Sequence, residues 1–346
     1  MKILLVRLSA IGDVLFATPL VAAVRRAYPT AEISWLVQPE CAPLIEHHPD
    51  LDRVLIWPKG EWRTLWQTGR RRDLARAMLD LRRRLRACRF DLALDLQGLA
   101  KSGLLTWLSG APERIGLGSR EASGYLMTRT LPRAGDERRI GSEYRFLAEH
   151  LGLPTADFAM ALYLTAADRA FAEIQITRHE LAGGHVALCP FTTRPQKHWQ
   201  ESRWAELADR LAAELDLPAV LLGGPNDRPA ADRIGHMTSG HLVDLVGATG
   251  LREAAALIER AALVIGVDTG LAHMGLALRR PSLLLFGATR PYLDPEQPDA
   301  RILYRALDCS PCRRGPTCDG RFPCMRSIEV GDCLAAARDL LRRDAR

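Results

Sequence analysis

Short apolar runs alternate along the chain with longer segments in which apolar residues recur every three or four positions. The first run covers residues 2–8, and a helical pattern follows the turn at 9–13 and extends to about residue 27. Three more short runs lie at 33–37, 53–57 and 91–96, and the intervening segment 68–88 has a helical composition. This alternation predicts a parallel sheet with helices on both faces.

The alternation begins again at residue 185, after a polar and helix-rich stretch near 150–180. Strands are predicted at 185–191, 218–223, 242–246, 262–267 and 282–286, and helices at 202–215, 227–237, 251–260 and 271–278. The predicted fold class is therefore α/β, with two doubly wound, Rossmann-like domains facing a cleft, residues 1–170 and residues 171–346. Whether the C-terminal helix packs back on the first domain is left open. Ligands are expected at the carboxyl ends of the strands.

Composition and charge narrow the class of protein. The 346 residues are 47% hydrophobic and 25% charged, as in ordinary globular domains. Arg7 and Asp13 interrupt the first apolar stretch before it reaches the length of a signal peptide, so we expect a cytoplasmic protein. The formal net charge is +6, and residues 1–170 hold the whole excess, with 25 basic against 19 acidic residues.

The positive charge is densest between Arg63 and Arg89, where ten arginines accompany two acidic residues. Such density is typical of a surface that binds an anionic partner, and equally of a solvated helix face. The arginines lack the interleaved aromatic residues of a surface that stacks nucleic-acid bases. We therefore expect no nucleic-acid partner.

Eight cysteines fall into two groups. Cys41, Cys88 and Cys189 lie in apolar contexts, where a small buried side chain is expected. The others cluster near the end of the chain, at Cys309, Cys312, Cys318, Cys324 and Cys333. The first pair of this cluster has zinc-like spacing, but a second Cys-x-x-Cys pair is missing. Reduced thiols packed beside the terminal helix are therefore preferred over a zinc site or a disulfide.

Asp13 is the first candidate for chemistry, because it lies where the first predicted strand ends and the first helix begins. An aspartate here can cap the helix by accepting a backbone N–H bond. The carboxyl end of a strand is also where an α/β enzyme places a general base. Spacing alone favours the cap.

Two turns in the second half predict a binding site for an anion. The loop Thr192-Thr-Arg-Pro-Gln-Lys-His-Trp199 gathers backbone N–H groups, two hydroxyls and three basic side chains, and Trp199 is expected to anchor it. The turn Gly266-Val-Asp-Thr-Gly-Leu-Ala-His-Met274 precedes a helix whose positive end would stabilise a diphosphate. Asp268 in that turn is either a cap or an acceptor for a sugar hydroxyl, and the second role is preferred because a carboxylate repels phosphate.

Several familiar signals are missing. Neither a Gly-x-Gly-x-x-Gly fingerprint nor a P-loop follows the first strand, which argues against dehydrogenases and P-loop kinases. A diphosphate bound without Mg²⁺ would need fixed positive groups, and Lys197 with the turn at Thr269 and Gly270 can supply them.

Four motifs in order resemble the ADP-heptose:lipopolysaccharide heptosyltransferases of glycosyltransferase family 9, over roughly residues 1–290. They are Met1-Lys-Ile-Leu-Leu-Val-Arg-Leu-Ser-Ala-Ile-Gly-Asp-Val14, Asp95-Leu-Gln-Gly-Leu-Ala-Lys-Ser102, the 192–199 loop and Val267-Asp-Thr-Gly-Leu-Ala-His273. The 192–199 loop, with Trp62-Arg63 ahead of a basic helix, looks closest to heptosyltransferase I, which adds the first heptose to the Kdo of the inner core. The resemblance implies a GT-B fold and an inverting, metal-independent transfer without a cofactor.

The resemblance also implies roles for individual residues. Asp13 would be the catalytic base that deprotonates the acceptor hydroxyl. The donor site would comprise Thr192, Thr193, Lys197, Asp227, Asp268, Thr269, Gly270 and His273. Asp227 lies where the family often has a glutamate near the adenosine ribose. Candidates for acceptor binding are Arg63, Arg70, Arg71, Arg72, Lys101 and Arg120.

The implied partners are the ADP-heptose donor and Kdo-lipid A or a related lipopolysaccharide acceptor. Peripheral contact with the anionic inner face of the bacterial inner membrane is expected from the basic first half. One alternative is heptosyltransferase II, or another family member acting on a later core or surface-polysaccharide acceptor. A more remote alternative is a non-catalytic protein that binds a nucleotide sugar or nucleic acid.

Overall fold

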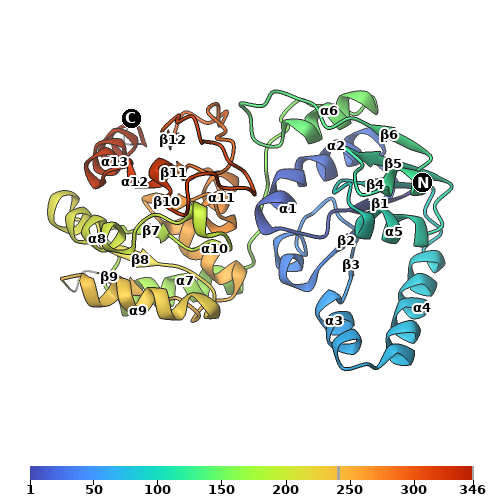
Figure 1. Ribbon diagram of the computed structural model, residues 1–346, viewed down its shortest axis with the longest axis horizontal. Helices are drawn as coiled ribbons and strands as arrows, with labels where there is room; N and C mark the ends of the chain where they lie inside the picture. The colour runs from blue at the N-terminus through green and yellow to red at the C-terminus, as the bar shows by residue number, and fades with distance from the viewer. Residues whose placement is uncertain (240–241, 345–346) are drawn as a thin grey trace. The chain divides into compact units, whose positions relative to one another are not determined.

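The computed structural model describes residues 1–239 and 242–344. Its contacts divide the chain into two units (Figure 1). The first comprises Met1–Glu137 and Gly141–Tyr163, and the second comprises Arg138–Ile140 and Leu164–Arg346. Helix α7 (Ala166–Arg178) spans the domain limit expected at residue 170 and packs against α10 (Leu251–Arg260) in the second unit.

The first unit is built on a six-stranded parallel sheet in the order β3-β2-β1-β4-β5-β6. Its central strand β1 is buried at almost every position, which explains why the first apolar run is continuous rather than alternating. The register pairs Ile3 with Ile33 of β2 and with Leu92 of β4. The strands are β1 (Lys2–Val6), β2 (Glu32–Val37), β3 (Arg53–Ile56), β4 (Leu92–Asp95), β5 (Glu113–Leu117) and β6 (Arg129–Leu131).

Helices of the first unit connect these strands. They are α1 (Ile11–Ala17), α2 (Pro19–Ala27), α3 (Lys59–Gln67), α4 (Arg71–Ala87), α5 (Ala100–Leu108) and α6 (Ser142–His150), with the short 3₁₀ helices η1 (Pro39–Leu44) and η2 (Ser123–Leu126). The prediction of one helix from the turn at 9–13 to residue 27 was wrong. Pro19 lacks the N–H that a continuous helix needs, so α1 ends at Ala17 and α2 begins with the proline at its first position.

The second unit repeats the arrangement, with a parallel sheet in the order β12-β11-β10-β7-β8-β9. Its strands are β7 (Val186–Cys189), β8 (Ala219–Leu221), β9 (Leu242–Asp244), β10 (Leu263–Val267), β11 (Ser282–Phe286) and β12 (Ala300–Tyr304). The remaining helices are η3 (Pro195–Lys197), α8 (Glu201–Leu215), η4 (Pro225–Asp227), α9 (Arg228–Met237), α11 (Gly270–Ala277), α12 (Pro323–Arg326) and α13 (Val330–Asp344). Helix α13 contacts α8 and strands β10, β11 and β12 of this unit.

The strand order fixes where a ligand is expected in each sheet. In the first unit the chain builds β1, β2 and β3 outward in one direction, then returns to place β4 beside β1. The second unit does the same, with β10 returning beside β7. Loops that leave the carboxyl ends of two such neighbours turn to opposite faces and open a crevice. Such a crevice marks the topological switch point of a sheet. It lies between β1 and β4 in the first unit and between β7 and β10 in the second.

No helix within residues 1–239 and 242–344 is both long and apolar enough to cross a bilayer. The predicted burial of Cys41, Cys88 and Cys189 is confirmed. Trp199 is also buried as expected, since only 2% of its surface is exposed and its indole N–H donates to the Ile328 carbonyl at 2.9 Å.

Two buried histidines predict how stability changes with pH. Burial lowers the pKa of His185 to about 4, although its hydrogen bond to the Leu257 carbonyl opposes that shift, and burial lowers the pKa of His48 to about 4 as well. Between pH 6.5 and 4 the unfolded chain binds protons that the folded chain excludes. The free energy of unfolding should therefore fall as the pH falls through this range, by about 2 kcal/mol for each histidine at pH 5.

Urea denaturation of the His185→Leu variant at pH 7 and pH 5 tests this expectation. On going from pH 7 to pH 5, the wild type should lose about 2 kcal/mol of unfolding free energy that the variant does not lose. The His47→Leu control removes an exposed histidine and should leave the pH dependence of the wild type unchanged. An equal loss of stability in wild type and His185→Leu between the two pH values would contradict the assignment.

Candidate active site

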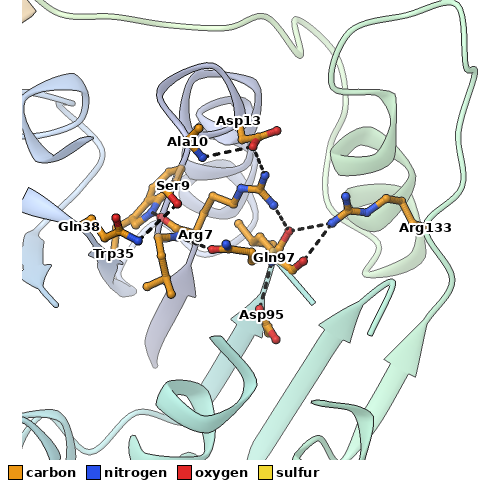
Figure 2. A network of polar contacts seen from close by, with 11 residues as sticks. Arg7, Ser9, Ala10, Asp13, Trp35, Gln38, Asp95, Gln97 and Arg133 are labelled. Carbon is orange, nitrogen blue, oxygen red and sulfur yellow. Dashed lines mark hydrogen bonds and ion pairs between the residues drawn. The ribbon is translucent and has the colours of Figure 1, made fainter. Parts of the chain in front are cut away.

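Asp13 lies at the switch point of the first unit, in the first turn of α1 after β1 ends. Its Oδ2 atom accepts a hydrogen bond from the Ala10 N–H at 3.2 Å and pairs with a guanidinium nitrogen of Arg7 at 2.6 Å. The side chain is 43% exposed, and Figure 2 shows its other oxygen pointing away from both partners. Asp13 thus caps the helix with one oxygen while the second oxygen faces solvent.

Arg7 fixes the position of this carboxylate. Only 4% of Arg7 is exposed, and its Nη1 donates to the Leu96 carbonyl at 3.0 Å, at the end of β4 (Figure 2). Burial alone would lower the pKa of Arg7, but interactions with Tyr144, Asp13 and Glu143 raise that pKa above its usual range. Arg7 is therefore a permanent positive charge that holds the Asp13 carboxylate in place.

The loop after β4 completes the network around Arg7. The Gln97 side-chain oxygen accepts from the Leu8 N–H at 3.0 Å, and Arg133 donates to the carbonyls of Leu96 and Gln97 at 3.4 Å. Asp95 accepts from the N–H groups of Gln97 and Gly98, both at 3.0 Å. Burial raises the pKa of Asp95, and these hydrogen bonds oppose the rise. The network ties the ends of β1 and β4 together (Figure 2).

The acceptor-binding candidates fall in two places. Lys101 lies in the first turn of α5, after β4, and the Arg120 N–H donates to the Gly98 carbonyl at 2.8 Å, beside the network just described. The other four follow β3 at the edge of the sheet: Arg63 on α3, and Arg70, Arg71 and Arg72 at the start of α4. All of these arginines are exposed, whereas Lys101 is half-buried.

The second switch point brings Lys197 and Asp268 into contact. Lys197 ends the 3₁₀ helix after β7, and its ammonium donates to the Asp268 carboxylate at 2.5 Å and to the Asp268 carbonyl at 3.3 Å. Both side chains are largely buried, with 16% and 14% of their surfaces exposed. Two of the three ammonium donors are thus engaged, and one remains to bind a ligand oxygen.

Asp268 is the centre of a wider cluster. His273 lies one helical turn away, and its Nε2 is 3.0 Å from Asp268 Oδ1. The Thr289 hydroxyl, which sequence reasoning missed, donates to Asp268 Oδ2 at 2.6 Å. Burial alone would raise the pKa of Asp268, but the hydrogen bond to His273 and the charge of Lys197 lower that pKa below its usual range. Asp268 is therefore ionised and orients Lys197.

The backbone around this cluster allows a close approach. A Cβ atom on Gly266 of β10 would lie 2.6 Å from the Ala272 side chain, so glycine lets α11 pack tightly on the strand. Thr269 and Gly270 then place the first N–H groups of α11 at the carboxyl edge of the sheet. Thr192 and Thr193 lie in the loop after β7, and the Thr192 carbonyl is 2.8 Å from Nε2 of His198.

Asp227 follows β8, in the short 3₁₀ helix that leads into α9. Its Oδ2 accepts from the Gly224 N–H at 2.8 Å, so the carboxylate supports its own turn. The side chain is half-buried, at the start of α9. The structure therefore shows Asp227 stabilising the turn, and a role toward the ribose of the donor remains a prediction.

The Asp268 cluster predicts a second effect of pH on stability. Asp268→Asn should lower the unfolding free energy at pH 7 by about 3 kcal/mol, because it leaves the buried Lys197 without its charged partner. A lowered folded pKa contributes stability that is present above the unfolded pKa and is lost as the pH falls below it. The difference in unfolding free energy between wild type and Asp268→Asn should therefore be constant above pH 5 and shrink below pH 4.

Denaturant titrations from pH 3 to pH 7 measure this difference. Asp319→Asn, whose side chain is 85% exposed, is the control and should stay within about 0.5 kcal/mol of wild type at every pH. If the difference in unfolding free energy between wild type and Asp268→Asn grew toward pH 3, the pKa of Asp268 would be raised by folding rather than lowered.

The cysteines near the end of the chain are free thiols, of which Cys324 and Cys333 are buried. Among the residues that the structure describes, no three His, Cys, Asp or Glu side chains are grouped so as to hold a metal ion. The cysteine loop instead contacts the region of the Asp268 cluster, since the Arg313 N–H donates to the Ala288 carbonyl and Gln196 donates to the Arg313 carbonyl.

Comparison with known proteins gives relatives along most of the chain. Lipopolysaccharide heptosyltransferase 1 of Pseudomonas aeruginosa is 28% identical over 319 residues, which cover 90% of this chain and 86% of the relative. Lipopolysaccharide heptosyltransferase 2 of Escherichia coli is 26% identical over 357 residues, which cover 99% of each.

Solved structures show the same fold. A family 9 glycosyltransferase from Veillonella parvula aligns with a TM-score of 0.84 at 21% identity, over 99% of this chain and 97% of that chain. The ADP-heptose lipopolysaccharide heptosyltransferase II of E. coli aligns with a TM-score of 0.77 at 24% identity, over the whole of both chains.

The family assignment follows from these findings together. The two six-stranded parallel sheets match those of the solved heptosyltransferases, which confirms the predicted α/β fold of the GT-B type. The family model for glycosyltransferase family 9 (heptosyltransferase) matches residues 78–320, which is more than half of the chain. The resemblance found in the sequence motifs is therefore confirmed, and this chain belongs to glycosyltransferase family 9.

Proposed function

We propose that this enzyme transfers L-glycero-D-manno-heptose from ADP-heptose to the Kdo of the lipopolysaccharide inner core, as heptosyltransferase I does. The observation that carries the transfer chemistry is the Asp13 carboxylate, which Arg7 holds at a switch point while one oxygen stays exposed. The names of the relatives support the choice of sugar and acceptor. The reaction is inverting and does not require a metal ion.

In this proposal the first unit activates the acceptor. Asp13 takes the proton from a Kdo hydroxyl as the acceptor oxygen forms a bond to the anomeric carbon of heptose. The bond between that carbon and the phosphate oxygen breaks, and ADP leaves with the electron pair. Arg7 is always protonated and lies 2.6 Å from Asp13, so it holds the carboxylate in position for this proton transfer.

The second unit binds the donor and stabilises the leaving group. The remaining Lys197 donor and the first N–H groups of α11 would neutralise the diphosphate, with Thr193 beside them. Asp268 is a positioning residue for Lys197, and its Oδ1 atom has a further acceptor site for a sugar hydroxyl. The start of α11 has no side-chain cap hydrogen bond, so of the two alternatives considered from the sequence we propose the sugar-hydroxyl role.

The acceptor is anionic, because Kdo carries a carboxylate and lipid A carries phosphates. Arg63, Arg70, Arg71, Arg72, Lys101 and Arg120 are the residues we assign to it. Since the acceptor is lipid-linked, we also propose that the enzyme works at the inner face of the bacterial inner membrane, bound peripherally.

A later acceptor is the second candidate. The 26% identity to E. coli lipopolysaccharide heptosyltransferase 2 extends over 99% of both chains, so we keep an acceptor of the heptosyltransferase II type as the alternative. The two candidates differ only in the acceptor, so they share the donor site and the base.

One assay tests both candidates. ADP release from ADP-heptose is followed with Kdo-lipid A and, separately, with heptosyl-Kdo-lipid A, each with and without EDTA. We expect turnover with Kdo-lipid A that EDTA leaves unchanged. Turnover only with the heptosylated acceptor would favour the second candidate, and loss of activity in EDTA would contradict the metal-independent mechanism. Binding of ADP-heptose without transfer to either acceptor would favour a non-catalytic nucleotide-sugar protein.

A further inference from the structure

The hairpin formed by α3 and α4 is the most basic part of the chain. Residues 59–89 hold eleven basic and three acidic residues, for a local charge of +8 against +6 for the whole protein. Figure 1 shows the two helices extending beyond the sheet of the first unit, with the turn at 68–70 at the tip. This segment is therefore a concentrated positive charge on a projecting element.

The outer face of α4 combines this charge with an exposed apolar side chain. Arg76, Leu79, Arg83 and Arg86 follow one another at intervals of three and four residues, so they share one face of the helix. Leu79 is 47% exposed, and the side chains of Arg76 and Arg83 are 77% and 79% exposed. The opposite face holds the buried residues of the helix, among them Leu81.

Trp66 adds a large exposed aromatic ring near the tip of the hairpin. It is 62% exposed, and the Arg71 guanidinium lies over the ring, 5.4 Å from its centroid. A tryptophan beside arginines on a helical element is typical of segments that rest in the headgroup region of a bilayer. A solvated helix face gains nothing from exposing Trp66 and Leu79, whereas a lipid surface would bury both.

The acidic residues of the hairpin do not neutralise its positive charge. Asp73 pairs with Arg70 and Arg76, and Asp80 pairs with Arg83, all at 2.9–3.2 Å. These pairs are exposed, so each contributes little and can open when a phosphate approaches. Eight positive charges remain after the three acidic residues are subtracted.

We infer that the α3–α4 hairpin docks the enzyme on an anionic lipid bilayer, with the outer face of α4 on the phosphates and Trp66 in the headgroup layer. The inference rests on the proposed function in one respect, since a lipid-linked acceptor requires the enzyme to work at a membrane. The outer face of α4 does not include Arg63, Arg70, Arg71 or Arg72, although Arg71 lies over the Trp66 ring near the tip.

Cosedimentation with vesicles tests the inference without donor or acceptor, so failed docking and failed transfer are distinguishable. The full chain should bind vesicles of phosphatidylcholine and phosphatidylglycerol, release them as salt increases, and leave vesicles of phosphatidylcholine alone unbound. Replacing Arg76, Arg83 and Arg86 with glutamate should weaken partitioning at least roughly 100-fold, since each basic residue near an anionic surface contributes roughly fivefold. Trp66→Ala should weaken it about tenfold.

A matched control separates a docking face from net charge. Arg26, Arg178 and Arg342 are exposed on helices α2, α7 and α13, and replacing them with glutamate changes the net charge by the same amount. This control should bind vesicles like the wild type, and all variants should retain the wild-type melting temperature. Equal loss in the control, wild-type binding by the hairpin triple variant, or failure of the wild type to bind anionic vesicles would overturn the inference. Tighter binding to an oligonucleotide that displaces the vesicles would assign the hairpin to nucleic acid instead.

Discussion

Replacing Asp13 by asparagine should lower the turnover of heptosyl transfer by roughly 10²–10⁴-fold, the usual contribution of a positioned general base. Asparagine keeps an oxygen that can accept from the Ala10 N–H, so the turn before α1 should persist. It cannot take a proton from the acceptor hydroxyl. Steady-state rates at saturating donor and acceptor measure the effect, which should appear in kcat rather than in KM.

Asp168→Asn provides the matched control for this variant. Asp168 also lies in the first turn of a helix, accepts the Thr165 N–H at 2.8 Å and pairs with Arg252 at 3.3 Å, but it lies far from any strand end in sequence. Its replacement should change stability without changing turnover. If Asp13→Asn retained turnover within about threefold of the control, Asp13 would act only as a cap.

Lys197→Ala should weaken the affinity for ADP by roughly 10- to 100-fold, because a charge-assisted contact to phosphate is lost. Asp268 holds the ammonium in place with two hydrogen bonds, so the free enzyme presents the remaining donor without reorganisation. Calorimetric titration with ADP in EDTA measures the dissociation constant directly.

The control for Lys197 is another of the four lysines. Lys59 is exposed at the start of α3, in the first unit, and Lys59→Ala should leave ADP affinity unchanged. An affinity within about twofold of wild type for Lys197→Ala would remove Lys197 from the donor site.

The central strands and helices could be predicted because their signals are local. The apolar run 282–286 is followed by Gly287, and β11 has the limits that this run predicted. The helix predicted at 251–260 likewise agrees with α10. The arginine-rich segment 68–88 is also helical, as α4 from Arg71 to Ala87. Strands β5, β6 and β12 were missed, since β6 has three residues and β12 is only partly buried at the sheet edge.

The candidate site was predicted only in part, because its partners come from distant segments. Asp13, Lys197 and Asp268 stood out by their position after strands, whereas Arg7 was treated only as a break in an apolar run. The structure makes Arg7 the residue that positions Asp13. The sequence offered one signal for Thr289, which lies just beyond the end of an apolar strand. Its contact with Asp268 depends on β11 lying beside β10, and the order of strands in a sheet is not a local property of the sequence.

A crystal structure of the enzyme with ADP, grown in EDTA, is the most direct test of how this chain neutralises its leaving group. The account predicts that the diphosphate lies within hydrogen-bond distance of Lys197 Nζ and the first N–H groups of α11, with the Lys197–Asp268 pair intact. A nucleotide bound elsewhere on the chain, or diphosphate oxygens held by neither Lys197 nor α11, would contradict it.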